Sequence, residues 1–135
     1  MFRVFTLIII FLFVNAEKYT YASNSSKQLG SIDFSTSVSG TAQKHFLHGV
    51  AALHSFWYTE ALSSFKKSVS LDSGFAMGYW GIAMAHNHPL WEEQDSESAK
   101  AALSKIKNIS KLTQREQDYI NALRVLYGKG GTHTR

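Results

Sequence analysis

The sequence predicts an all-α protein made of antiparallel helix pairs, about two pairs followed by one extra helix. Three observations support this prediction. The chain resembles itself at a spacing of about 34 residues, apolar residues recur at steps of three and four, and helix-boundary residues separate the apolar segments. The composition agrees, since 44% hydrophobic residues suffice for one core, and 0 Cys exclude disulfide bonds.

In its first part, the internal repeat matches residues of a first unit with residues about 34 positions further along the chain. The matched pairs are Ala42 with Ala76, Phe46 with Trp80, Ala51 with Ala85, His54 with His88 and Trp57 with Trp91. Beyond Pro89 the spacing becomes larger, which places about seven extra residues between Pro89 and Ser98. Because insertions in repeat proteins fall in loops, we expect a longer loop there.

Each unit is predicted to form two helices. The predicted helices cover residues 43–56, 58–69 and 75–86, then a fourth from Asp95 or Ser96 through Ile106, and a fifth from the Thr113–Glu116 capping box to near Gly128. Thr59 is the expected cap of the second helix, and a left-handed Gly74 is expected to end it. Asp72 or Ser73 is expected to cap the third helix, and Pro89 to stop it.

Residues 1–22 have the features of a secretory signal peptide. Arg3 precedes an uncharged apolar run from Val4 to Val14, and small residues follow at Ala16 and Ala22. A bilayer span needs roughly 20 apolar residues, so an uncleaved membrane anchor is the less favoured alternative. Either interpretation predicts an exported protein of the cell envelope, periplasmic or secreted.

The remaining segments differ in composition. Residues 23–40 are Ser-rich and are predicted to be a flexible leader, residues 41–128 form the helical domain, and residues 129–135 are a disordered tail. Stacked repeats usually need about three or more units. A truncated fragment of a longer repeat protein with no independent activity is therefore one hypothesis, and a fifth helix that acts as the cap is another.

Several residues at this spacing resemble the tetratricopeptide repeat (TPR), which is a helix pair of about 34 residues. Small residues stand at Gly49 and Ala83 in the first helices of the two units. In the second helix of the first unit, Ala61 is followed by the large Phe65 and then by the Leu71–Asp72 turn. The resemblance covers about residues 42–128 and implies a right-handed α-solenoid, in which the first helix of each pair lines a concave groove.

The chain departs from the usual repeat at two places and is similar to a particular group of proteins over one further segment. Ser73 stands where proline is usual in the repeat, and the second unit contains the longer loop. Residues 75–91 are similar to part of longer, mostly uncharacterised exported bacterial TPR proteins. That similarity implies no established activity.

The resemblance places seven residues in the groove, with Leu53 beside them in the first unit. They are Phe46, Val50, His54, Trp80, Met84, Asn87 and His88. Aromatic rings and a flexible Met suit the binding of a peptide or helix, and His54, Asn87 and His88 could donate orienting hydrogen bonds. The alternative for Phe46 and Trp80 is that both simply fill the core between helices.

The leading functional hypothesis is a non-enzymatic scaffold that binds a protein or peptide. No phosphate-binding loop, nucleophile elbow or pair of catalytic carboxylates occurs, so we expect neither a catalytic residue nor a cofactor. The basic residues are scattered and the net charge is +4, which does not suit nucleic-acid binding. A His-rich metal-binding protein is the alternative, with His54 and His88 as candidate ligands. The oligomeric state is left open.

Overall fold

The structure, a computed structural model, describes residues 29–128, and within this range the chain is all-α apart from two very short strands. The five helices of this range are α2 (Gly40–His54), α3 (Tyr58–Leu71), α4 (Ala76–Met84), α5 (Ser96–Leu103) and α6 (Gln114–Tyr127). The all-α prediction is therefore confirmed. The predicted signal peptide (1–22) and tail (129–135) lie outside the described residues.

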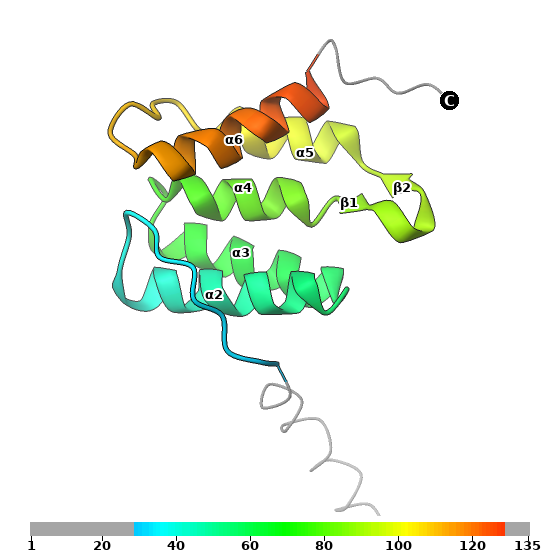
Figure 1. Cartoon of the computed structure of the whole chain (residues 1–135), viewed down its shortest axis with the longest axis horizontal. Coiled ribbons are helices and arrows are strands. Elements are labelled where there is room, and N and C mark those ends of the chain that lie inside the picture. Colours follow the sequence, from blue (N-terminus) through cyan, green and yellow to red (C-terminus); the bar gives the residue numbers. More distant parts are fainter. Residues whose placement is uncertain (1–28, 129–135) are drawn as a thin grey trace, which may run out of the picture. The chain divides into compact units, whose positions relative to one another are not determined.

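Contacts divide the chain after Gly30, and all described helices belong to the unit that begins at Ser31. In this unit α2 packs on α3, α3 packs on α4, and α4 contacts both α5 and α6 (Figure 1). The short connection between α2 and α3 makes these neighbours antiparallel. Between residues 29 and 128, no helix has the length and apolar character needed to cross a membrane.

The core is built around Phe65 of α3, which is completely buried. Its ring lies against two glycines that belong to different helices, Gly49 of α2 and Gly81 of α4. A Cβ atom at Gly49 would lie 2.7 Å from Phe65 Cδ1, and one at Gly81 would come closer still. Real Cβ atoms do not approach a ring so closely. The absence of a side chain at both glycines therefore lets α2 and α4 close on the same ring.

The helix starts agree with the predicted caps in α5 and α6. Asp95 precedes α5, and its Oδ1 accepts a hydrogen bond from Ser98 N at 3.0 Å. Thr113 precedes α6 and forms the reciprocal capping box with Glu116. At the other end of α6, Tyr127 is buried and its hydroxyl donates to Ala83 O at 3.2 Å, which ties α6 to α4.

The predicted helix 58–69 begins at Tyr58 as α3 does, but α3 continues to Leu71 and the predicted capping residues were wrong at both ends. Trp57, rather than Thr59, is the N-cap residue, because its carbonyl oxygen already accepts from Ala61 N at 2.9 Å. Gly74 is not left-handed. The turn after α3 depends instead on Asp72, whose Oδ1 accepts from Gly74 N at 2.9 Å.

The third predicted helix was too long. Phe75 is the N-cap residue of α4 and has no side-chain cap, so neither Asp72 nor Ser73 caps this helix. The helix ends at Met84, two residues before the predicted end at His86. After Met84 the backbone tightens, since His86 N donates to Ala83 O, three residues back, at 3.3 Å, and His86 O then accepts from Asp95 N at 2.9 Å across the insertion.

The insertion between α4 and α5 is more ordered than the expected loop. It contains β1 (Asn87–His88), the 3₁₀ turn η2 (Pro89–Trp91) and β2 (Glu93–Gln94), and the two strands pair antiparallel. In Figure 1 this hairpin extends beyond the end of α4. The insertion therefore forms a defined element at one end of the helices.

The segment 31–39 belongs to the predicted flexible leader (23–40), and in the structure this segment packs on the helices. We call it the strap. Burial alternates along it: Ile32, Phe34, Thr36 and Val38 are half-buried, whereas the residues between them are exposed. Such alternation is typical of an extended segment with one face on the protein. The leader was judged from its Ser content, which does not reveal these contacts.

We expect Gly81→Ala to lower the free energy of unfolding by about 1–3 kcal/mol, measured by urea denaturation, because the added methyl group overpacks a ring that is held on both sides. The cost of overpacking exceeds the roughly 1 kcal/mol by which alanine is favoured over glycine within a helix. In a Phe65→Val background the smaller side chain makes room, so the same substitution should cost much less. An equal cost in both backgrounds would show that the contact with Phe65 is not responsible.

Candidate functional site

Aromatic rings from α2, α4, α6 and the strap form one cluster. We call Phe34, Phe46, Trp80 and Tyr119 the aromatic quartet. The ring of Phe34 lies 5.4 Å from that of Phe46, 6.0 Å from Trp80 and 5.3 Å from Tyr119, measured between centroids. The rings of Phe46 and Trp80, which the repeat matches with each other, lie 6.3 Å apart. The strap therefore lies over a face that α2, α4 and α6 form together.

Side chains of α2 and α6 bind the backbone of the strap. Gln43 Nε2 donates to Phe34 O at 2.8 Å, and Arg115 donates to Ser35 O. The guanidinium of Arg115 also lies 4.9 Å from the centroid of the Phe34 ring, within the range of a cation–π contact. Gln43 and Arg115 thus hold the strap by two of its carbonyl groups and by the ring of Phe34.

Glu116 joins the strap to the capping box of α6. Its carboxylate accepts from Ser37 N at 2.8 Å and from the Ser37 hydroxyl, and also from Thr113 N at 3.0 Å and Thr113 Oγ1 at 2.8 Å. Only 1% of Glu116 is exposed. Burial by itself would raise the pKa of Glu116, but the hydrogen bonds from Ser37 and Thr113 outweigh it and hold the pKa below the ordinary value.

A cavity of about 350 Å³ opens beside Phe34 on the same face. Its lining is mostly apolar and comes from the strap, α2, α3, α4, α6 and the insertion. The lining residues are Phe34, Val50, Leu53, His54, Phe56, Tyr58, Trp80, Met84, Asn87, Pro89 and Tyr119. Five of the seven predicted groove residues are therefore brought together here, namely Val50, His54, Trp80, Met84 and Asn87.

The other two predicted groove residues lie elsewhere. Phe46 is completely buried and contacts the rings of Phe65 and Phe75 at 5.7 and 5.3 Å, so it belongs to the core. This was the alternative interpretation of the sequence for Phe46. His88 does not line the cavity, because its ring stacks on that of Tyr58 at a centroid distance of 4.0 Å.

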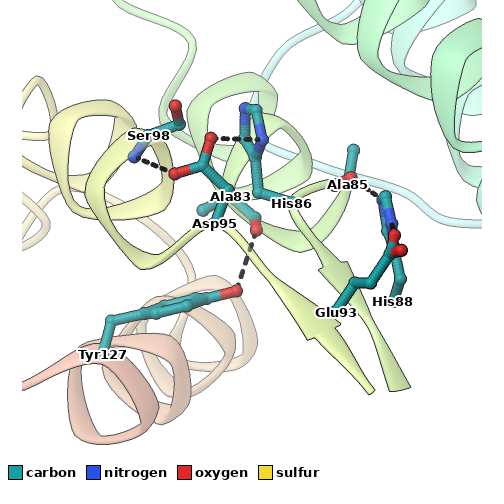
Figure 2. Close-up of polar contacts among 8 residues, drawn as sticks. All are labelled: Ala83, Ala85, His86, His88, Glu93, Asp95, Ser98 and Tyr127. Atoms are coloured by element: carbon teal, nitrogen blue, oxygen red, sulfur yellow. Dashed lines mark hydrogen bonds and ion pairs between the residues drawn. The ribbon is translucent and has the colours of Figure 1, made fainter. Parts of the chain in front are cut away.

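The ring nitrogens of His88 are both engaged. Nε2 lies 3.0 Å from Ala85 O, and Nδ1 lies 3.4 Å from a carboxylate oxygen of Glu93 (Figure 2). Among residues 29–128, no group of three or more His, Cys, Asp or Glu side chains is placed to hold a metal ion. The hypothesis of a metal site at His54 and His88 therefore gains no support from the geometry of the described residues.

The base of the insertion is closed by His86 and Asp95, which Figure 2 shows side by side. His86 Nδ1 lies 3.7 Å from Asp95 Oδ2, in addition to the backbone hydrogen bond between the two residues. Burial lowers the pKa of His86, although the charge of Asp95 acts in the opposite direction. These contacts fix the end of α4 and so position Asn87 and Pro89 at the cavity.

Besides Pro89, which was expected only to stop a helix, sequence reasoning missed four residues of this lining: Phe34, Phe56, Tyr58 and Tyr119. For Phe34, the alternation of apolar and polar residues from Ile32 to Val38 was a signal for an extended, half-buried segment. The other three carried no such signal, because their place in the lining depends on contacts between distant parts of the chain.

A second hollow of about 420 Å³ lies near Ser73, Tyr79 and Lys105, and it contains none of the predicted site residues. The cavity beside Phe34 is the better candidate, because aromatic and aliphatic side chains surround it and Asn87 and His54 supply polar groups. Such a lining suits binding of an apolar side chain. Comparisons with protein-family models, with curated proteins and with solved structures give no match.

We expect Glu116→Gln to release the strap, because a neutral amide accepts weaker hydrogen bonds than a carboxylate. The loss should be about 1–3 kcal/mol in the free energy of unfolding, together with faster amide exchange at Ser37. Because the pKa of folded Glu116 lies below its ordinary value of 4.5, the unfolded chain takes up the proton first. The stabilisation is therefore complete above pH 4.5 and is lost as the pH falls through the folded-state pKa.

The matched control is Glu97→Gln, which removes another carboxylate from the first turn of a helix, at an exposed position. This variant should keep the acid sensitivity of the unmodified chain and the slow exchange at Ser37. If Glu116→Gln and Glu97→Gln unfold with the same pH profile, the proposed role of Glu116 is wrong.

Proposed function

We propose that the protein is a non-enzymatic, TPR-like scaffold that binds an extended peptide on the face formed by α2, α4 and α6. In this proposal α2 with α3 and α4 with α5 are two copies of one helix-pair unit, and α6 is the extra helix. The proximity of Phe46 to Trp80, at 6.3 Å, supports the matching of these positions in the two copies. The shared face corresponds to the groove that the resemblance implies.

The strap is the observation that carries this proposal. It is a peptide segment in extended conformation, and it lies on the same face with alternate residues directed toward the helices. Gln43 and Arg115 bind its carbonyl groups, and Glu116 accepts from its amide at Ser37. Backbone contacts combined with a pocket for one side chain are the usual way in which proteins bind extended peptides.

The cavity beside Phe34 supplies the free part of the binding face. Its volume of about 350 Å³ falls in the range of ligand pockets, which begins near about 300 Å³. Met84 and Leu53 offer adaptable apolar contacts, while Asn87 can donate or accept a hydrogen bond. The partner is therefore a protein or peptide segment with an apolar side chain that enters this cavity.

The proposal also includes the cellular location in which the protein binds its partner. The apolar run from Val4 to Val14 supports export to the cell envelope, where the partner would be met. The proposal requires no metal, cofactor or nucleic acid.

Random dodecapeptides, displayed on phage and selected on the purified chain, test this function. We expect peptides with an aromatic or large aliphatic residue to be enriched. Leu53→Glu places a charge in the apolar cavity and should weaken binding of the selected peptides by about tenfold or more. Fluorescence anisotropy with the synthetic peptides measures this loss.

Leu62→Glu is the matched control, because Leu62 is a half-buried leucine of α3 outside the cavity lining. It should keep the affinity of the unmodified chain, and thermal unfolding of both variants shows whether each one folds. A selection without enrichment, or peptides that bind Leu53→Glu as well as Leu62→Glu, would contradict peptide binding in this cavity.

A further inference from the structure

The cavity ends at a group of half-exposed aromatic rings. We call Phe56, Tyr58 and Trp91 the aromatic triad. The centroid distances are 6.5 Å between Phe56 and Tyr58, 6.1 Å between Phe56 and Trp91, and 5.8 Å between Tyr58 and Trp91. Phe56 is 51% exposed and Trp91 is 55% exposed. Phe56 and Tyr58 also line the cavity, so the triad continues the proposed binding face.

The backbone at Phe56 is unfavourable for an aromatic residue. Its φ is +59°, in the left-handed region. The surrounding hydrogen bonds, Phe56 N to Leu53 O at 3.1 Å and Trp57 N to Ala52 O at 2.9 Å, have the pattern of a helix end at which glycine is preferred. A half-exposed ring at this position adds little to the core. Strain of this kind is common where a side chain serves binding rather than stability.

The segment around Trp91 is strongly acidic. Residues 87–97 contain Glu92, Glu93, Asp95 and Glu97 but no Lys or Arg, although the whole chain has a net charge of +4. The side chain of Glu93 is 72% exposed. The cavity lining likewise contains no Lys or Arg. Trp91 of the triad is therefore flanked in the sequence by carboxylates, which favour a cation over an anion. Two of these carboxylates, Glu93 and Asp95, also face His88 and His86.

We infer that the aromatic triad binds a Lys or Arg side chain of the peptide partner. A cation over the face of an aromatic ring is attracted by the ring quadrupole, and Trp is the best acceptor. The carboxylates next to Trp91 add charge complementarity. This inference rests on the proposed function: the partner places an apolar side chain in the cavity and a basic side chain a few residues away on the triad.

Three synthetic peptides test the inference. The first is acetyl-Gly-Ser-Phe-Ser-Arg-Ser-Gly-amide, and the other two carry citrulline or glutamate in place of arginine. Citrulline keeps the shape of arginine without its charge. In ¹⁵N-labelled protein we expect the arginine peptide to shift the indole N–H signal of Trp91 and to bind about fivefold more tightly than the citrulline peptide, as one cation–π contact provides. The glutamate peptide should bind most weakly.

Phe56→Gly is the decisive variant, because glycine suits the left-handed backbone. Its thermal stability should equal or exceed that of the unmodified chain, so a loss of binding cannot be caused by unfolding. We expect it to bind both peptides more weakly than the unmodified chain and to lose most of the preference for arginine over citrulline, because one ring of the triad is absent. Leu90→Ala is the control, since it removes a 67% exposed apolar side chain beside Trp91 but no ring. It should keep the preference for arginine.

The outcomes separate this inference from the proposed function. If the arginine and citrulline peptides bind equally to the unmodified chain, or Leu90→Ala loses the preference as Phe56→Gly does, the cation site is wrong while peptide binding stands. If none of the three peptides shifts a signal of a cavity or triad residue, and the phage selection also yields no binder, both proposals are wrong.

Discussion

The close contact of Phe65 with Gly49 and Gly81 is the constraint on which the other features depend. A large ring from α3 fills the space between α2 and α4, and these two helices can approach it only because glycine leaves the ring uncovered. Their approach brings Phe46 and Trp80 together at 6.3 Å. The face that carries the strap and the cavity is therefore a consequence of packing around one buried side chain.

Glu116 connects the start of α6 to the strap. Its single carboxylate accepts hydrogen bonds from both donors of Thr113, its neighbour in the capping box, and from both donors of Ser37, which is distant in the sequence. The helix start and the strap are thus stabilised by the same group. A buried carboxylate is tolerated because its oxygens are hydrogen-bonded, and its lowered pKa reflects these donors.

Some helix ends that depend on local chemistry could be predicted from the sequence, whereas the predicted caps Thr59 and Gly74 of α3 were wrong. The start of α5 at Asp95 and the capping box of α6 required only neighbouring residues. The end of α4 could not be predicted, because the chain there enters a hairpin whose base is closed by a hydrogen bond across the insertion, from Asp95 N to His86 O. Five of seven groove residues line one cavity, whereas His88 is held aside by Tyr58, a contact between residues of different helix pairs.

The closed base of the insertion fixes the points at which the chain leaves α4 and enters α5. Since His86 and Asp95 meet there, the tip of the hairpin can change in length without moving either helix, while His88 and Trp91 contact Tyr58 of α3. Loops anchored in this way tolerate insertion and exchange. The hairpin is thus a natural place to graft new recognition segments, and divergence among relatives of this chain would be expected to concentrate there.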